Sequence, residues 1–252
     1  MPNINLIRRV LLRPPATVAG GGGPTDPYWT STKLLMGFEG TNGSTGSPGY
    51  NDESSAAHGT ATTAGSPIPT ISTSQFDFGA SSLSLTGAAR LEFANSADFQ
   101  LGSNPFTLDL SWRPANISGT QILLGLFSDP SFGWRIYQSN ATLNWQVSTN
   151  GSNAFTDITS GNVLTANTWS KIALDYDGSK YRMYAGGTMI GSSSTPRSIF
   201  ASTSALAIGG SVSVVNPFFA SGNMDELRIT KGVGRYASDA GYTVATAAFP
   251  RS

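Results

Sequence analysis

The chain has 252 residues, with 15 lysine and arginine residues against 15 aspartate and glutamate residues, one histidine and no cysteine. Charged residues make up only 12% of the sequence, and no apolar run approaches the roughly 20 residues that span a bilayer, so neither nucleic acid nor a membrane is an expected partner. The lack of cysteine excludes disulfides, thiolate metal sites and a cysteine nucleophile.

The first 13 residues, "MPNINLIRRVLLR", combine apolar and basic side chains. Two adjacent arginines interrupt the apolar stretch, which argues against a cleaved secretory signal. Disordered tails are usually poor in apolar residues, whereas segments of this kind commonly fold on docking, so we predict an extended arm that binds another protein. A disordered tail is the plainer interpretation. The residues expected to make the contact are Ile4, Leu6, Ile7, Arg8, Arg9, Val10, Leu11, Leu12 and Arg13.

Residues 14–27, "PPATVAGGGGPTDP", have the composition of a linker. Proline stiffens its start, and the four consecutive glycines make a flexible joint. From residue 28 to residue 252 the composition is that of one compact β-domain.

Within residues 28–252, short runs of alternating apolar and polar residues are separated by turn residues. "FTLDLSW" (106–112) places its aromatic and leucine side chains on one face. "DGSK" (177–180) predicts a hairpin, and "GWRIYQSNATLNWQV" (133–147) predicts another that turns at Ser139 and Asn140. Half-buried strands joined by hairpins predict an all-β fold, an antiparallel two-sheet sandwich.

Four segments resemble the concanavalin A-like lectin/glucanase superfamily, in its laminin G-like jelly-roll branch. They are "LLMGFEGTNGS" (34–44), "SQFDFGASSLSLTGAARLEFANSADFQLGSNPFTLDLSWRP" (74–114), "TANTWSKIALDYDGSKYRMYAGGTMIGS" (165–192) and "GNMDELRITKGVGRYASD" with its tail (222–250). The last segment resembles the form found in structural proteins of tailed bacteriophages. The resemblance implies a jelly-roll sandwich over about residues 28–250.

In some members of this branch, calcium is held by the acid of the first strand, an aspartate loop and the acid of the last strand. Position for position, these are Glu39, Asp52 and Asp225. The loop departs from the usual pattern, because it reads "NDESSAAHG". The alternative is that Glu39 and Asp225 are hydrogen-bonded at strand ends or paired with Arg228. No other cofactor is expected.

Catalysis is not predicted. Members of the fold that hydrolyse glucans carry Glu-x-Asp-x-Glu on one strand, and no such triplet occurs here. The nearest spacing is that of Asp175 and Asp177, both expected in solvent. Asp225 and Glu226 are adjacent, so on a strand they point to opposite faces. His58 is expected in a surface loop.

Sugar binding would use aromatic platforms beside polar side chains, and the predicted hairpins supply candidates. The alternative is that these aromatic rings belong to the core and that the arginines are solvated. The candidate residues are Trp134, Arg135, Tyr137, Trp145 and Arg182.

The most charged passage, "GNMDELRITKGVGRYAS" (222–238), is predicted to be a strand followed by a loop. Simple alternation places Met224, Glu226 and Arg228 on one face, with Glu226 and Arg228 paired on the outer surface. Asp225 would then share the other face with buried leucine and isoleucine, where its carboxylate needs a partner.

Together these features predict a non-enzymatic bacteriophage virion structural protein, either a capsid decoration or cement protein or a fibre or tail-surface component. Its arm would bind a major capsid or tail protein, and its lectin-like sandwich would lie on the virion surface. The alternative is a carbohydrate-binding module that recognises host surface glycans. Association into a homo-oligomer stays open, since nothing in the sequence determines a copy number.

Overall fold

The computed structural model describes residues 25–212 and 218–252, and nearly all regular structure in this part of the chain is β. Its helices are two 3-10 turns, Trp29–Ser31 and Ala97–Phe99. Neither of them is long enough to cross a membrane. The predicted arm, residues 1–13, and the predicted linker as far as residue 24 lie outside the described residues.

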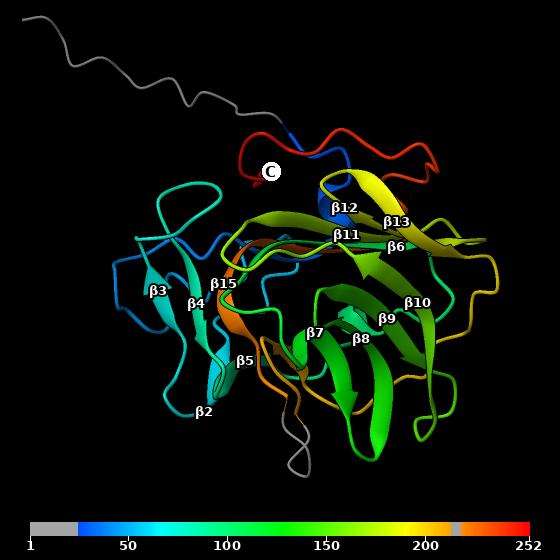
Figure 1. Ribbon diagram of the computed structural model, residues 1–252, viewed down its shortest axis with the longest axis horizontal. Helices are drawn as coiled ribbons and strands as arrows, with labels where there is room; N and C mark the ends of the chain where they lie inside the picture. The colour runs from blue at the N-terminus through cyan, green and yellow to red at the C-terminus, as the bar shows by residue number, and fades with distance from the viewer. Residues whose placement is uncertain (1–24, 213–217) are drawn as a thin grey trace, which may run out of the picture.

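The strands form two antiparallel sheets (Figure 1). The larger has eight strands, in the order β13-β12-β11-β6-β15-β4-β3, with β1 pairing with β15 beside this path. Its strands are β1 (Thr32–Met36), β3 (Thr70–Ser72), β4 (Ser82–Thr86), β6 (Phe106–Pro114), β11 (Ser170–Tyr176), β12 (Tyr181–Ala185), β13 (Thr188–Ser193) and β15 (Ser221–Lys231).

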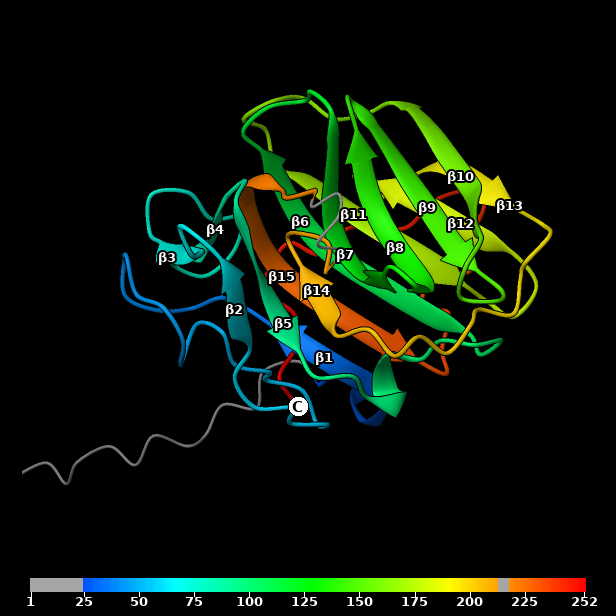
Figure 2. The ribbon, with the colours of Figure 1, turned by 90° about the horizontal axis from the view of Figure 1, so that it is seen from below.

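The second sheet has seven strands, in the order β10-β9-β8-β7-β14-β5-β2. Figure 2 looks onto this sheet, with the eight-stranded sheet behind it. Strands distant in sequence lie side by side, as where β15 pairs with β6 and β14 pairs with β7. The predicted jelly-roll sandwich is therefore confirmed. The strands of this sheet are β2 (Thr62–Gly65), β5 (Ala89–Phe93), β7 (Thr120–Ser128), β8 (Ser131–Ser139), β9 (Thr142–Ser148), β10 (Ala154–Asn162) and β14 (Leu206–Ile208).

The core lies between the two sheets and follows the alternation of the sequence. The inward side chains of β6 are fully or almost fully buried, as are those of β8 and β9. Their rings pack edge to face or tilted, with Phe106 and Trp145 at 5.8 Å and Trp134 and Trp145 at 6.0 Å between ring centroids. The indole N–H of Trp112 donates to Gln138 at 2.9 Å, so this buried polar atom is satisfied.

Both predicted hairpins are present. Between β8 and β9 the chain turns at Asn140, whose φ of 52° lies in the left-handed region that asparagine tolerates. Between β11 and β12, Asp177 accepts hydrogen bonds from the backbone N–H groups of Ser179 and Lys180. These local bonds explain why turn residues alone located both hairpins.

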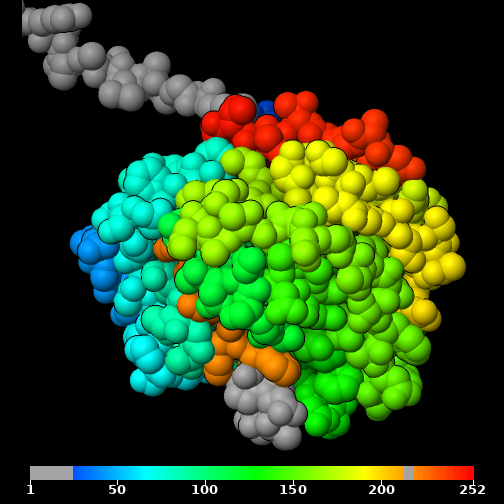
Figure 3. Space-filling view, in the orientation of Figure 1, coloured from blue at the N-terminus to red at the C-terminus, as the bar shows by residue number. Residues whose placement is uncertain are grey.

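The C-terminal tail, residues 232–252, crosses the outer face of the eight-stranded sheet, where Figure 3 shows its atoms along the top of the molecule. Alternation predicts that the outward side chains of β6 are solvated, but Thr107, Asp109 and Ser111 are buried. At the far end of the tail, the carbonyl of Ser252 accepts from the N–H of Asp26 at 2.7 Å. The folded region therefore already includes Asp26, within the predicted linker.

Candidate functional site

Beneath the tail, the eight-stranded sheet carries buried ion pairs. Arg228 contacts Asp109 at 2.8 Å, and both side chains are less than 10% exposed. The hydroxyl of Tyr236 donates to the other oxygen of Asp109 at 2.7 Å. Arg235 donates to both oxygens of Asp26 at 2.9 and 2.8 Å. Every charge in this network has a partner, and the pairs tie the tail to the sheet.

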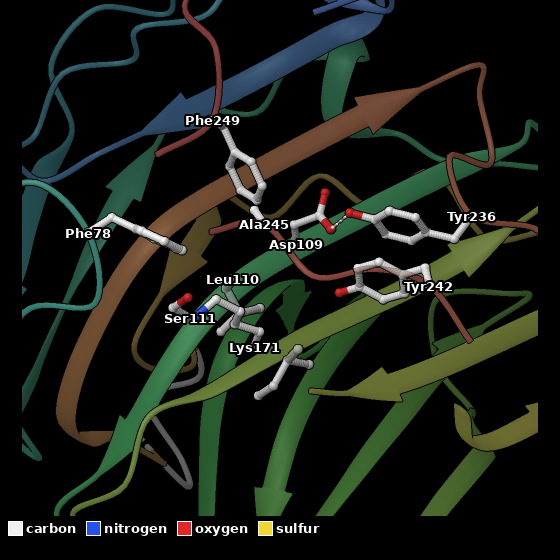
Figure 4. Close-up of a pocket in the computed structure, with 10 residues that line it drawn as sticks. Phe78, Asp109, Leu110, Ser111, Lys171, Tyr236, Tyr242, Ala245 and Phe249 are labelled. Carbon is white, nitrogen blue, oxygen red and sulfur yellow. Dashed lines mark hydrogen bonds between the residues drawn. The ribbon is translucent and has the colours of Figure 1, made fainter. Parts of the chain in front are cut away.

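Little space remains under the tail. A cavity of about 20 Å³ lies among Lys171, Tyr242, Phe249 and their neighbours (Figure 4). The ring of Tyr242 stacks on that of Tyr236 at 3.7 Å and closes one side. A volume of this size holds about one water molecule, so this cavity has no room for a sugar.

Strand β15 contains a bulge that the sequence pattern did not reveal. Asp225 pairs with Ser111 and Arg228 with Asp109, so two residues of β15 oppose one residue of β6. Glu226 takes a φ of 46° there. The prediction that Met224 and Arg228 share a face is therefore wrong. The core side receives Met224, Leu227 and Ile229.

The predicted surface pair between Glu226 and Arg228 is also wrong. Glu226 is 1% exposed, and its carboxylate binds Arg251 of the tail at 2.7 Å. Arg228 binds Asp109 instead. The charged passage therefore fastens the tail and presents no catalytic pair.

Asp225 is fully buried and its partners are backbone groups. It accepts from the N–H of Asp77 at 2.8 Å, of Phe78 at 2.9 Å and of Glu226 at 2.9 Å. Burial raises the pKa of Asp225 to about 7, because the hydrogen bonds only partly offset the loss of hydration.

The predicted calcium ligands do not converge. Glu39 accepts from the backbone N–H of Ala80, and Asp52 from the N–H groups of Leu35 and His58, while Asp225 is occupied as described above. Within residues 25–212 and 218–252, no three acidic or histidine side chains gather in a way that holds a metal ion. The predicted grouping is therefore wrong, and hydrogen bonding at strand ends is the correct alternative for Glu39.

The carboxylates expected in solvent are also engaged. Asp175 is fully buried, where it accepts from the hydroxyl of Thr107 at 2.7 Å and from the N–H of Ala237 at 2.9 Å. Burial raises the pKa of Asp175 above its usual range. Asp177 pairs with Arg182 at 2.6 Å. Asp175 therefore departs from the prediction because the tail covers it.

The outer face of the seven-stranded sheet differs from that of the eight-stranded sheet, since no backbone hydrogen bond joins the described tail to β7, β8 or β9. Arg135 and Tyr137 project from β8 and remain half-buried. Amide side chains follow on β9, and exposed threonines follow on β10. We call this surface the Arg135 face; it consists of Phe127, Arg135, Tyr137, Asn144, Gln146, Thr156 and Thr159.

Arg135 lies against two aromatic rings. Its guanidinium carbon is 4.2 Å from the ring centroid of Phe127 and 5.0 Å from that of Tyr137. Its Nε donates to Gln146 at 2.6 Å. Burial lowers the pKa of Arg135 from its usual value.

The amides of this face are held in place by threonines. The hydroxyl of Thr159 donates to Asn144 at 2.8 Å, and the amide of Gln146 donates to Thr156 at 3.3 Å. Oriented amides and hydroxyls beside a partly exposed ring are the groups that recognise sugar hydroxyls.

Of the five predicted glycan-binding residues, two lie together on this face. Trp134 and Trp145 are fully buried in the core, so their prediction as a sugar platform is wrong and the core alternative holds. Arg182 lies on the other sheet, 8% exposed and bound to Asp177 and Asp239. Of the predicted residues, Arg135 and Tyr137 therefore remain as candidates for glycan binding.

Sequence reasoning missed the amides and one ring. Asn144 and Gln146 alternate with the core residues of β9, so the period of two already places them beside Tyr137 and Arg135. Phe127 stacks on Phe132 at 4.4 Å, and a register shift between β7 and β8 brings the two together. That shift leaves no simple signal in the sequence.

Two wider hollows border β2, of about 300 and 390 Å³. The first is lined by His58 and Glu92 among others, but Glu92 pairs with Arg90 at 2.6 Å and His58 lies 3.3 Å from Asp98. The second is lined by Tyr50 and small or hydroxyl-bearing residues. The carboxylate of the first hollow is therefore already paired with an arginine, and the lining of the second includes no charged side chain.

Solved structures with this fold share little sequence with the chain. Domain 4 of the extracellular arabinanase AbnA from Geobacillus stearothermophilus, in complex with arabinotriose, has a TM-score of 0.60 at 17% identity; the match covers 81% of this chain and 93% of that one. The binding domain of Paraclostridial Mosquitocidal Protein 1 has a TM-score of 0.58 at 14% identity, and the match covers 81% of this chain and 49% of that one. The botulinum neurotoxin serotype G binding domain has a TM-score of 0.56 at 13% identity, and the match covers 82% of this chain and 49% of that one.

The chain thus spans about half the length of these two toxin domains, and at such identities the likeness is one of fold. No curated protein sequence matches the chain significantly. The sequence profile of the concanavalin A-like lectin/glucanases superfamily matches residues 85–233, more than half of the 252. The strand order, the buried core and this match agree, and the chain belongs to that superfamily.

Proposed function

We propose that the protein is a non-enzymatic, lectin-like domain that binds a glycan on the Arg135 face. The observation that carries the proposal is that Arg135 and Tyr137 stand half-buried beside two amides whose orientation is fixed by hydrogen bonds. A preorganised polar surface with an accessible ring loses little entropy when it receives a sugar. The saccharide would stack on Tyr137 and exchange hydrogen bonds with Gln146 and the exposed threonines of β10, while Asn144, which is 4% exposed, holds Thr159 in place.

Two properties of similar proteins support binding as the activity. The arabinanase domain was solved with arabinotriose, and the two toxin structures are named as binding domains. These properties belong to those proteins. They support the proposal because the same sandwich fold serves ligand recognition in them.

Hydrolysis is disfavoured by the arrangement of carboxylates. A retaining glycosidase needs two carboxyl groups about 5–5.5 Å apart at an open cleft. The seven side chains of the Arg135 face include no carboxylate. On the opposite sheet, Asp109, Asp175 and Asp225 are buried under the tail or a loop and are hydrogen-bonded.

Replacing Tyr137 with alanine tests the proposal. We expect the purified protein to bind a subset of a glycan array and Tyr137→Ala to bind it at least tenfold more weakly, about 1.4 kcal/mol, because the stacking ring is lost. Phe76→Ala is the matched control, since Phe76 is an aromatic residue 44% exposed outside this face. Equal binding by Tyr137→Ala and the parent protein, or no binding to any glycan, would contradict the proposal.

Attachment to a bacteriophage particle is a separate proposal. It rests on the composition of residues 1–13 and on the resemblance of residues 222–250 to phage structural proteins. A domain held in this way on a virion surface would present its glycan-binding face to host cells. Particles assembled with a protein lacking residues 1–13 should fail to retain it on a sucrose gradient. Normal retention of the truncated protein would refute arm-mediated attachment.

A further inference from the structure

The positive charge of Arg135 indicates which class of glycan the Arg135 face would bind. We infer that the Arg135 face binds an acidic saccharide, and that Arg135 receives its negatively charged oxygen substituent, a carboxylate or a sulfate. This inference rests on the proposed function, since it concerns the same surface.

Arg135 has no counter-charge among the described residues. Six other arginines of the described chain contact a carboxylate at 2.6–3.0 Å, whereas no aspartate or glutamate among residues 25–212 and 218–252 contacts Arg135. The six paired arginines are Arg90, Arg182, Arg197, Arg228, Arg235 and Arg251. A half-buried cation without a partner has lost hydration that a bound anion would replace.

The terminal nitrogens of Arg135 are donors without an acceptor among the described residues. Nε of Arg135 is occupied by Gln146, and none of the described residues accepts from its two terminal nitrogens. These nitrogens are not sealed in the protein either, because they are not among its buried atoms that lack a partner. The two terminal nitrogens therefore keep some access to solvent and carry four N–H groups with no acceptor among the described residues, in a planar fork that can bind carboxylate or sulfate through two parallel hydrogen bonds.

The guanidinium fork of Arg135 is held in position. The strands approach closely at its base, since a methyl group on Gly125 would lie 2.7 Å from Cβ of Arg135 and 2.9 Å from the carbonyl oxygen of Trp134. Phe127 and Tyr137 contact the guanidinium, and Gln146 orients its Nε. A side chain fixed in this way loses little rotamer freedom when it binds an anion.

The donors of Arg135 lie beside the other polar groups of the Arg135 face. Tyr137 lies beside Arg135 on β8, and the amides of Asn144 and Gln146 lie on the adjacent strand. A pyranose stacked on Tyr137 would therefore place an acidic substituent within reach of the guanidinium, while its hydroxyls meet the amide of Gln146 and the exposed hydroxyls of β10. Neutral sugars would use the same ring and amides and leave the arginine unpaired.

Matched saccharides test the inference. Calorimetry at low and physiological salt can measure the binding of two matched pairs to the full-length protein. The first pair is trigalacturonate and its methyl ester, and the second is a sulfated disaccharide and its unsulfated parent. We expect an acidic member to bind at least tenfold more tightly than its neutral match, with the difference shrinking as salt rises. The carboxylate and sulfate pairs show which substituent the site prefers.

Variants tie the preference to the arginine. Arg135→Gln should abolish the tenfold preference, so that the acidic member and its neutral match bind with equal affinity, whereas Arg135→Lys should keep part of the preference. Arg113→Gln is the control, because no carboxylate of the described residues pairs with Arg113 either, and Arg113 lies on the other sheet. An unchanged melting temperature for each variant shows that the fold is intact.

The outcomes separate the two proposals. Tyr137-dependent binding of neutral and acidic saccharides with equal affinity would overturn the inference and leave the proposed function standing. Acidic preference that survives Arg135→Gln, or is lost equally in Arg113→Gln, would also overturn it. Absence of binding to every saccharide would contradict both.

Discussion

Replacing Arg228 with methionine is expected to lower the free energy of unfolding by about 3–5 kcal/mol. Methionine fills a similar volume, but it leaves the carboxylate of Asp109 buried without its cation. Asp26 keeps Arg235 and so adds little to the loss. The ring of Phe249, 3.7 Å from the guanidinium carbon of Arg228, also loses a contact that holds the tail. Guanidinium unfolding followed by tryptophan fluorescence measures the effect.

Two further variants isolate the cause. Lys33→Met removes a half-exposed pair with Asp98 at 3.9 Å and should cost less than about 1 kcal/mol. Adding Asp109→Asn to Arg228→Met should recover part of the stability, because the uncompensated charge is gone and Tyr236 keeps an acceptor. A cost for Arg228→Met no larger than that of Lys33→Met would show that the network under the tail does not stabilise the fold.

Asp225→Asn is expected to change how stability depends on pH. Because burial raises the pKa of Asp225 to about 7, the folded protein keeps a proton on this side chain that the unfolded chain releases near pH 4. Its contribution is therefore fully present below pH 4 and is lost as pH rises through 7. Relative to the variant, the parent protein should lose roughly 3–4 kcal/mol of unfolding free energy between pH 4 and pH 8.

The measurement is denaturant unfolding of both proteins at matched pH values. Asparagine keeps an oxygen that can accept from the N–H groups of Asp77 and Phe78, so it imitates the protonated acid. Other carboxylates titrate in both proteins, and the difference between them isolates position 225. A difference that does not vary with pH would mean that Asp225 titrates normally.

The sequence was sufficient to predict the sandwich because its strands obey local rules. Alternation in "FTLDLSW" places Phe106 and Trp112 in the core, and both are fully buried. Turn residues located the two hairpins, since Asn140 and Asp177 make their bonds within a few residues of themselves. Features of this kind need no knowledge of distant parts of the chain.

The outer face of the eight-stranded sheet could not be predicted in the same way. Asp109 and Arg228 are 119 residues apart in sequence, and both have the alternation of solvated positions. Only the path of the tail makes them buried. The bulge at Glu226 likewise depends on pairing between β15 and β6. It turns Met224 to the core side, opposite to the face that simple alternation assigns to this residue.

The sequence predicted part of the candidate site. Its error was to group Trp134 with Arg135 on one surface. Adjacent residues on a strand point to opposite faces, so Trp134 and Arg135 cannot line one surface. The larger apolar side chain takes the core, because burial of its surface is favourable, and the arginine takes the outside. Applied to "GWRIYQ" and "TLNWQV", the same rule selects Arg135, Tyr137, Asn144 and Gln146 together.

A crystal structure of the protein soaked with the best ligand of the glycan array would test the central claim most directly. We predict that the saccharide lies on β8 and β9, with a ring against Tyr137 and an oxygen of its acidic group within about 3 Å of the terminal nitrogens of Arg135. A saccharide bound elsewhere, for example in the hollows beside Thr62, with the Arg135 face bare, would contradict the account.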